Sequence, residues 1–254
     1  MNVAFLLRDY MKLLKQLRVN GYGFGPVKAY FEGAEAPFVF LRHDVDRLPG
    51  RAVAMAEIEQ SLDISATYYF RCNNFGKFPE IHIEQVAEME HEIGFHYESF
   101  SRAEGDYSKA LGLFGRELDS LRKIVEVKTV APHGKPLSKF SNMEESRNVD
   151  LKSFGLLGEP YSDIDYKKVL YITDTGGIFG SSNNIRDWVD GKNFQKPTTP
   201  EKLGKMLDPQ SEPLILLNCH PERWADNMIG LSVATMKDFA INIAKRIIRI
   251  FRRK

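Results

Sequence analysis

Short apolar segments alternate with amphipathic segments along most of this 254-residue chain, and this alternation limits the fold more than any other feature. The apolar segments have the length and the aromatic and β-branched content of strands. The segments between them repeat apolar residues at helical spacing, as Met55, Ile58 and Leu62 do. Parallel strands joined by crossover helices give this pattern, so an α/β fold is predicted. The predicted strands cover residues 38–43, 65–71, 92–97, 127–132, 151–155, 168–174 and 214–220.

We predict one domain over residues 1–254, with an amphipathic helix at 3–19 and a basic helix at 232–252 flanking the sheet. The basic helix either packs on the core with a basic solvent face or contacts anionic lipid or a lipid-linked substrate, and the sequence leaves both possibilities open. The region around 133–200 is rich in Gly, Ser, Asn, Asp and Pro, which is typical of long loops near a site.

Composition excludes several classes of protein. The chain is 43% apolar and 27% charged with a net charge of +1, so its charge gives no reason to expect a nucleic-acid partner. The two cysteines, Cys72 and Cys219, stand apart, which fits a reducing compartment. No segment reaches the ~18 apolar residues of a membrane span. The first helix carries charges through its apolar run, unlike a signal peptide, so we expect a cytoplasmic protein.

The segment FVFLRHDVD at 38–46 is an apolar strand that ends in two carboxylates. Asp44 and Asp46 are two residues apart, so an extended backbone points both to the same side. Ionised carboxylates at the end of a buried strand need a partner, because leaving them unpaired is costly. A bound metal, a neighbouring arginine or a chemical task shared by the two carboxylates would explain their presence there.

Further polar residues follow the other predicted strands: Arg71, His96, His133, Asp174 and His220. The carboxyl ends of parallel strands lie at one edge of the fold, where α/β proteins carry their sites. We therefore expect these side chains to converge on one site.

Four motifs support a family resemblance: RHDVD at 42–46, EIGFHYESF at 92–100, VAPHG at 130–134 and LLNCHPERW at 216–224. With these motifs in this order, the chain resembles the polysaccharide deacetylase (NodB-homology) family over about 38–224. The resemblance implies an irregular (β/α) barrel of about seven parallel strands, and removal of an acetyl group from an N-acetylated sugar. The wording of the motifs is similar to a branch found in gene clusters for O-antigen and other surface polysaccharides.

The resemblance implies a divalent metal held by Asp46 and His96, zinc being the first choice and cobalt, manganese or nickel the alternatives. The second histidine of the family's metal pair falls at Phe100, which cannot bind a metal. His133 is the first candidate to replace it, and Glu98 is the fallback. The alternative without a metal is that Asp46 caps a helix and His96 is a core histidine.

The same resemblance makes Asp44 the general base and His220 the general acid, with Asp174 holding His220. The family's arginine that holds the catalytic Asp falls at Val130. Arg71 is our first candidate for this role in catalysis, and Arg42 is the alternative.

Four residues are assigned to the substrate: Glu98, Trp188, Arg223 and Trp224, although Trp224 is equally plausible as a core residue. The expected substrate is an N-acetylated sugar linked to a nucleotide or a lipid. Two alternatives stay open: a degenerate barrel that binds saccharide without turnover, and a related C–N hydrolase acting on a small cyclic amide. The changes at Phe100 and Val130 favour the degenerate barrel, whereas a retained base and acid oppose it.

Overall fold

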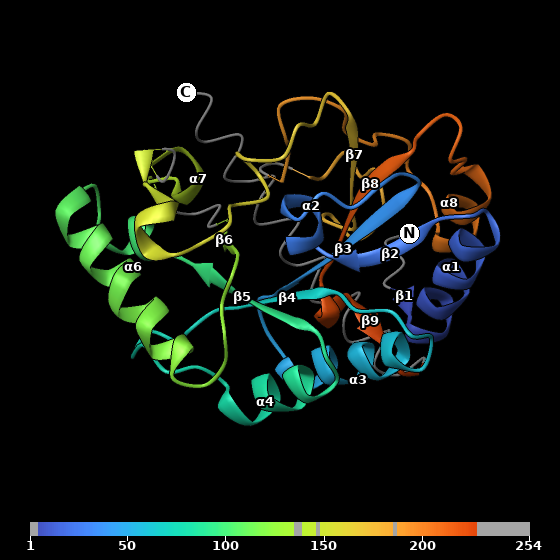
Figure 1. Cartoon of the computed structure of the whole chain (residues 1–254). Coiled ribbons are helices and arrows are strands. Elements are labelled where there is room, and N and C mark those ends of the chain that lie inside the picture. The colour runs from blue at the N-terminus through green and yellow to red at the C-terminus, as the bar shows by residue number, and fades with distance from the viewer. Residues whose placement is uncertain (1–4, 135–138, 146–147, 185–186, 228–254) are drawn as a thin grey trace.

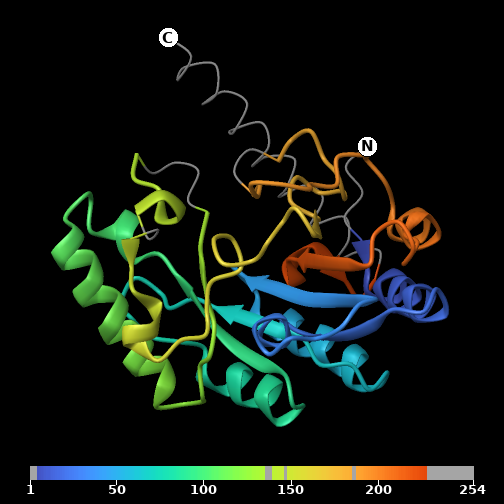
Figure 2. The same ribbon diagram turned by 45° about the horizontal axis from the view of Figure 1, so that its top comes forward.

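A curled, parallel β-sheet forms the centre of the protein (Figure 1). The structure, a computed structural model, describes residues 5–134, 139–145, 148–184 and 187–227. The strand order is β6-β5-β4-β3-β8-β7, with β2 also paired to β3, and every pairing is parallel. The sheet curls into a half-barrel with β6 and β7 at its edges (Figure 2). The strands are β2 Gly23–Pro26, β3 Phe38–Val45, β4 Thr67–Phe70, β5 Glu92–Tyr97, β6 Val130–Pro132, β7 Val169–Thr173 and β8 Leu214–Cys219.

Helices cover the outer face of this sheet (Figure 1). Side chains of α1, α3, α4 and α6 share one apolar cluster with the outward-facing residues of β3, β4 and β5. A separate two-stranded sheet, β1 with β9, lies beside α1. The helices are α1 Leu7–Val19, α2 Lys28–Phe31, α3 Pro49–Gln60, α4 Glu80–Glu88, α5 Ser99–Arg102, α6 Tyr107–Arg122, α7 Asn142–Glu145 and α8 Pro200–Met206; β1 is Phe5–Leu6, β9 is Trp224–Ala225, and two 3₁₀ turns are η2 Leu151–Phe154 and η3 Pro221–Arg223.

Strand β3 lies at the middle of the sheet and is buried on both faces. Leu41 packs in the helix-side cluster, while Phe40 packs in a second cluster on the inner face. Because side chains alternate along a strand, Arg42 and Asp44 lie on the inner face with Phe40. His43 lies on the helix side, where its Nε2 is 2.7 Å from Oε1 of the buried Glu59 on α3. The inner face of β3 therefore carries the candidate site residues, and its helix-side face carries the buried His43–Glu59 pair.

The register aligns the carboxyl ends of neighbouring strands. Strand β8 pairs with one edge of β3 over Phe38–His43, and β4 pairs with the other edge of β3 from Arg42 onward. On the next strands, His96 of β5 lies opposite Ala131 of β6. This alignment brings the polar residues that follow each strand to one rim, as predicted.

Six of the seven predicted strands are present, and the prediction at 151–155 is wrong. This segment is the 3₁₀ turn η2. The side chain of Asp150 accepts hydrogen bonds from the amides of Lys152 and Ser153, and Gly155 ends the turn at φ 68°. A local side-chain cap competes with strand pairing in such a segment.

Strand β2 was not predicted, because its residues GFGP carry too few β-forming side chains. Phe38 of the neighbouring strand explains the glycine at 25: a Cβ there would lie 2.9 Å from the Cζ of Phe38. The predicted helix at 3–19 is present as α1 over Leu7–Val19. The predicted helix at 232–252 lies outside the described residues. Within those residues, no helix is long and apolar enough to cross a membrane.

Candidate active site

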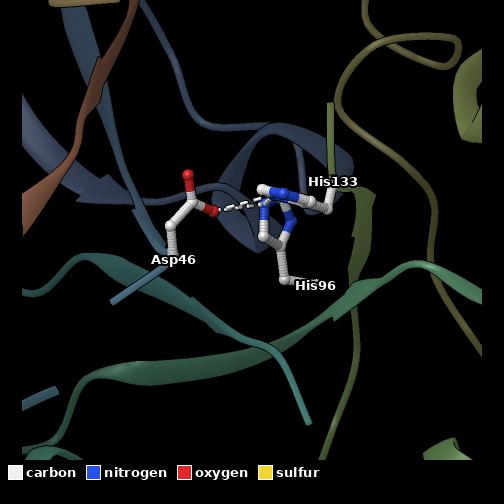
Figure 3. Close-up of side chains that lie close together, drawn as sticks. All are labelled: Asp46, His96 and His133. Carbon is white, nitrogen blue, oxygen red and sulfur yellow. Dashed lines mark hydrogen bonds and ion pairs between the residues drawn. The ribbon is translucent and has the colours of Figure 1, made fainter. Parts of the chain in front are cut away.

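The predicted rim residues come together at the carboxyl ends of β3, β5, β6 and β8. Asp46 follows β3, His96 belongs to β5 and His133 follows β6. The Nδ1 of His133 lies 2.8 Å from Oδ1 of Asp46, and the Nε2 of His96 lies 3.3 Å from the same oxygen (Figure 3). The two histidine nitrogens are 3.2 Å apart. Three ligand-type atoms from three strand ends thus face a common point.

The hydrogen bonds around these histidines fix which nitrogens are available. His96 donates from Nδ1 to the carbonyl oxygen of Ala131 at 3.1 Å, because a carbonyl can only accept. Its Nε2 therefore is the nitrogen that faces Asp46. The Nε2 of His133 lies 3.5 Å from Oε1 of Glu98, so Glu98 stands behind His133. A carboxylate behind a histidine is the usual arrangement around a metal-binding imidazole.

The charges of this cluster are strongly coupled. Burial alone would raise the pKa of Asp46, but the charge of His133 and its hydrogen bonds with both histidines hold the pKa well below its usual range. Burial lowers the pKa of His133, and the neighbouring Asp46 and Glu98 raise it above its usual value. Oδ1 of Asp46 is buried, and both imidazole nitrogens approach it within 3.3 Å. Three ligand-type atoms this close together fit a bound cation, and one carboxylate with two imidazoles suits a divalent transition metal.

The position at which the motif resemblance would place a second histidine is occupied by Phe100. Its ring is fully buried and packs edge-on against Tyr97, 6.1 Å between centroids. His133 reaches the cluster from the end of β6. Its carbonyl accepts a hydrogen bond from Nδ2 of Asn142 at 2.8 Å, which ties α7 to the site.

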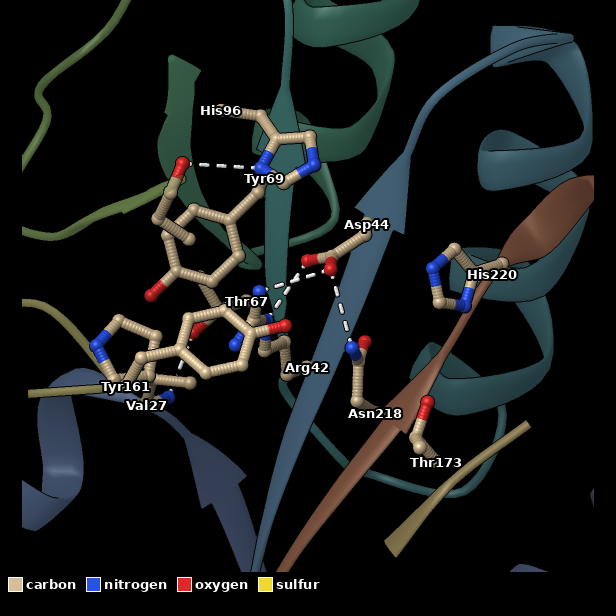
Figure 4. Close-up of polar contacts among 12 residues, drawn as sticks. Val27, Arg42, Asp44, Thr67, Tyr69, His96, Tyr161, Thr173, Asn218 and His220 are labelled. Atoms are coloured by element: carbon tan, nitrogen blue, oxygen red, sulfur yellow. Dashed lines mark hydrogen bonds and ion pairs between the residues drawn. The ribbon is translucent and has the colours of Figure 1, made fainter. Parts of the chain in front are cut away.

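Asp44 occupies the inner face of β3, two residues before Asp46. Arg42 donates from Nε and Nη2 to its two oxygens at 2.8 and 2.9 Å, and Asn218 Nδ2 donates to Oδ2 at 3.1 Å (Figure 4). Burial alone would raise the pKa of Asp44, but the charge of Arg42, with smaller contributions from His96 and His220, lowers it to about 2. The carboxylate is thus ionised and fixed in orientation.

His220 and Asp174 form a second coupled pair. The Nδ1 of His220 lies 2.7 Å from Oδ1 of Asp174, and the His220 amide donates to Oδ2 at 3.0 Å. Burial and the charge of Arg223 lower the pKa of His220, but the charge and hydrogen bond of Asp174 outweigh them and raise it to about 9. His220 is therefore protonated at neutral pH and can donate a proton. Asp174 holds it, as predicted.

The arginine beside Asp44 is Arg42, which corrects our first choice of Arg71. Arg71 forms an ion pair with Glu98 and approaches Nε2 of His133 at 3.4 Å, so it belongs to the histidine side of the site. Arg42 is also held between two aromatic rings, 4.4 Å from the Tyr161 centroid and 5.3 Å from that of Tyr69.

Two of the residues predicted to bind substrate contact Asp174 instead. Trp224 is fully buried and donates from Nε1 to Oδ2 of Asp174 at 2.9 Å, so it is a core residue and cannot contact a substrate. Arg223 is also buried and donates to the Asp174 backbone oxygen at 2.6 Å. The sequence could not place these side chains, because the chain turns back toward Asp174 in η3.

Trp188 lines a cleft of about 740 Å³. Tyr161, whose ring lies against the Arg42 guanidinium, and Tyr97, which follows His96, line the same cleft. Met143, next to the Asn142 that contacts His133, lines it as well. None of the candidate catalytic or metal-binding side chains lines the cleft, so it adjoins the site through these neighbours.

Asn218 and Tyr161 were not among the predicted residues. Asn218 precedes His220 by two positions on a strand, so alternation would have placed both side chains on one face. Tyr161 lies in an irregular loop, where the sequence carries no such signal.

Comparison with family models and with curated proteins gives no match. Among solved structures, the chain is similar to a family 4 carbohydrate esterase from Bacillus anthracis, with 16% identity over 92% of this chain and 84% of that one, at a TM-score of 0.42. It is also similar to the catalytic domain of a peptidoglycan N-acetylglucosamine deacetylase from Eubacterium rectale, with 10% identity over 82% and 85% of the two chains, at a TM-score of 0.47.

Proposed function

We propose that the protein is a metal-dependent hydrolase that removes an acetyl group from an N-acetylated sugar. One observation carries the proposal: an ionised carboxylate and a protonated imidazole stand at the rim where Asp46, His96 and His133 converge. Titratable groups whose surroundings push their pKa values apart are a mark of acid–base assignments.

Asp46, His96 and His133 would hold the metal. A divalent ion held there would polarise the acetyl carbonyl and lower the pKa of the attacking water. The carboxylate behind His133 orients that imidazole, and the Nδ1 contact with Ala131 orients His96.

Asp44 and His220 would divide the proton transfers. Asp44 accepts a proton from the attacking water as the C–O bond forms. His220 then donates its proton to the amide nitrogen as the C–N bond breaks, so acetate and the free amine of the sugar are released. Asp174 keeps the imidazolium oriented through Nδ1, which leaves Nε2 to face the substrate.

The finer parts of the proposal follow from the motif resemblance. We infer a role in the biosynthesis of a surface polysaccharide of O-antigen type, with the sugar carried on a nucleotide or a lipid. Zinc is the metal we favour, because one carboxylate and two imidazoles are common zinc ligands. A cytoplasmic location, with peripheral contact at an anionic membrane, completes the proposal.

The test is release of acetate from N-acetylated sugars by the metal-loaded protein. Asp44→Asn and His220→Ala should each lower turnover by about 10²–10⁴-fold, as is usual for a general base or acid. The matched control Asp119→Asn changes an exposed carboxylate on α6 and should keep full activity. Near-normal turnover of either site variant, with unchanged circular dichroism, would refute the assignment. Turnover of cyclic amides but not of N-acetylated sugars would favour the alternative C–N hydrolase.

A further inference from the structure

A second pocket, of about 450 Å³, adjoins the histidine side of the site. Asp46 and Arg71 form part of its wall, so it opens directly beside the candidate metal centre. Its lining contains three cationic side chains, Arg47, Arg71 and Lys77, and one carboxylate, Asp46. None of our functional assignments so far accounts for Arg47 or Lys77.

The cations of this pocket differ in how far they are neutralised. Arg71 pairs with Glu98, and Nη2 of Arg47 lies 3.3 Å from Oε1 of Glu222. The Arg47 side chain is still 45% exposed, so part of its guanidinium faces solvent. No ion pair involves Lys77 within the described part of the chain. Lys77 is exposed and is the cation of this pocket that no carboxylate of the described residues neutralises.

The backbone around Lys77 is held in place. Its amide donates to Oδ1 of Asn73 at 3.1 Å, and its carbonyl accepts from the Asn73 amide at 2.9 Å. The two hydrogen bonds fix the backbone from which the Lys77 side chain extends at the pocket wall. Less conformational freedom is then lost when a ligand binds.

Two helices begin at the same pocket. Pro49 is the first residue of α3 and Pro79 precedes α4; both line the pocket, and neither helix has a side-chain cap. The two helix starts are close together, since a Cβ on Gly50 would lie 3.7 Å from Nε2 of His82. The prolines have no N–H to donate, but the positive ends of the two helix dipoles add to the charge of the three side chains.

The aromatic cleft on the other side of the rim has the opposite charge. Asp150, Glu159, Asp163 and Asp190 line it, against one cation, Lys152. An anionic group would be repelled there and attracted at Lys77. The two cavities therefore give a substrate with one anionic end a single favourable orientation.

We propose that the pocket formed by Arg47, Arg71 and Lys77 binds the phosphate or diphosphate group of the sugar substrate. This inference rests on the proposed deacetylation and specifies its substrate. In a 2-acetamido sugar 1-phosphate, the amide and the phosphate are on neighbouring carbons. A phosphate in this pocket would thus leave the acetyl group next to Asp46, while the rest of the sugar faces the aromatic cleft.

Binding of pyrophosphate to the metal-loaded protein, measured by calorimetry at constant ionic strength, tests the proposal. Lys77→Glu should weaken binding by about tenfold or more, because it replaces an attractive charge with a repulsive one. The matched control Lys15→Glu reverses an exposed charge on α1, away from the pocket, and should bind as the wild type does. Lys77→Ala should give an intermediate affinity.

Two further ligands distinguish the source of the phosphate. Tighter binding of uridine diphosphate than of pyrophosphate would assign a nucleotide carrier, and tighter binding of farnesyl diphosphate would assign a lipid carrier. Equal binding of all three would support recognition of the diphosphate alone. Absence of binding, or an affinity that Lys77→Glu leaves unchanged, would overturn the proposal. Because no turnover is needed, a protein that binds pyrophosphate through Lys77 but releases no acetate would refute only the proposed deacetylation.

Discussion

The two halves of the candidate site are built on different principles, although Asp44 and Asp46 are only two residues apart. In the acid–base half, Asp44 is satisfied by Arg42 and Asn218. In the half that would hold the metal, Asp46 instead faces two imidazole nitrogens through its Oδ1. Protein donors fix the orientation of the first carboxylate, whereas the second lies among ligand-type atoms that a cation could bridge. Carboxylates on the same face of one strand can thus serve different tasks, because their neighbours differ.

Asp174→Asn should have the largest effect among changes that leave the reacting groups in place. His220 would lose the charge that keeps it protonated and oriented, and we expect activity to fall by about 10²-fold. The pH profile gives the specific readout. In the wild type, activity should fall as pH rises through about 9, where His220 loses its proton. Without the Asp174 charge the pKa of His220 drops, so this decline should move to lower pH. An unmoved alkaline limb would show that His220 is not the acid.

The same pair predicts a change in stability with pH. The pKa of His220 rises on folding from the usual histidine value of about 6.5 to about 9, so the pair stabilises the fold below pH 6.5 and this contribution is lost as pH rises through 9.

Arg42→Lys tests which arginine serves the acid–base half. A lysine cannot donate the two parallel hydrogen bonds that Arg42 gives Asp44, so we expect turnover to fall by about tenfold. The parallel change Arg71→Lys affects the histidine side and should weaken metal binding more than turnover at saturating metal. Steady-state kinetics at increasing metal concentrations distinguishes a loss of turnover from a loss of metal binding in the two variants. The reverse pattern would mean that Arg71, our initial choice, holds the base.

Asn218→Ala should have the smallest effect. It removes one hydrogen bond of 3.1 Å to Asp44 and leaves both Arg42 contacts. A single neutral donor to a carboxylate contributes about 1 kcal/mol, which corresponds to roughly a fivefold loss of turnover. Its metal content should equal that of the wild type, because Asn218 belongs to the acid–base half. A loss of metal would contradict the separation of the two halves.

Much of the site could be predicted because it depends on strand ends. Asp46, His96, His133 and His220 follow or end parallel strands, and the register alone brings such positions to one rim. The sequence alone did not decide which of two arginines, Arg42 or Arg71, pairs with Asp44. Arg42 holds Asp44 because both lie on one face of β3.

Loops and turns were the weakest part of the prediction. The side chain of Trp224 turns into the core toward Asp174, which depends on a three-residue 3₁₀ turn. Residues 151–155 have strand-like composition, but the cap from Asp150 decides their conformation. In both cases a tertiary or local hydrogen bond overrides the apolar pattern.

Metal content of the purified protein tests the central claim most directly. We expect about one equivalent of a divalent transition metal in the wild type by elemental analysis, and its loss in both His96→Ala and His133→Ala. His82→Ala, which changes a histidine on α4, is the matched control and should retain the metal. Loss in His96→Ala alone would move the third ligand to another residue, Glu98 first. No bound metal after addition of Zn²⁺, Co²⁺ or Mn²⁺ would contradict the account and leave saccharide binding without turnover as the better interpretation.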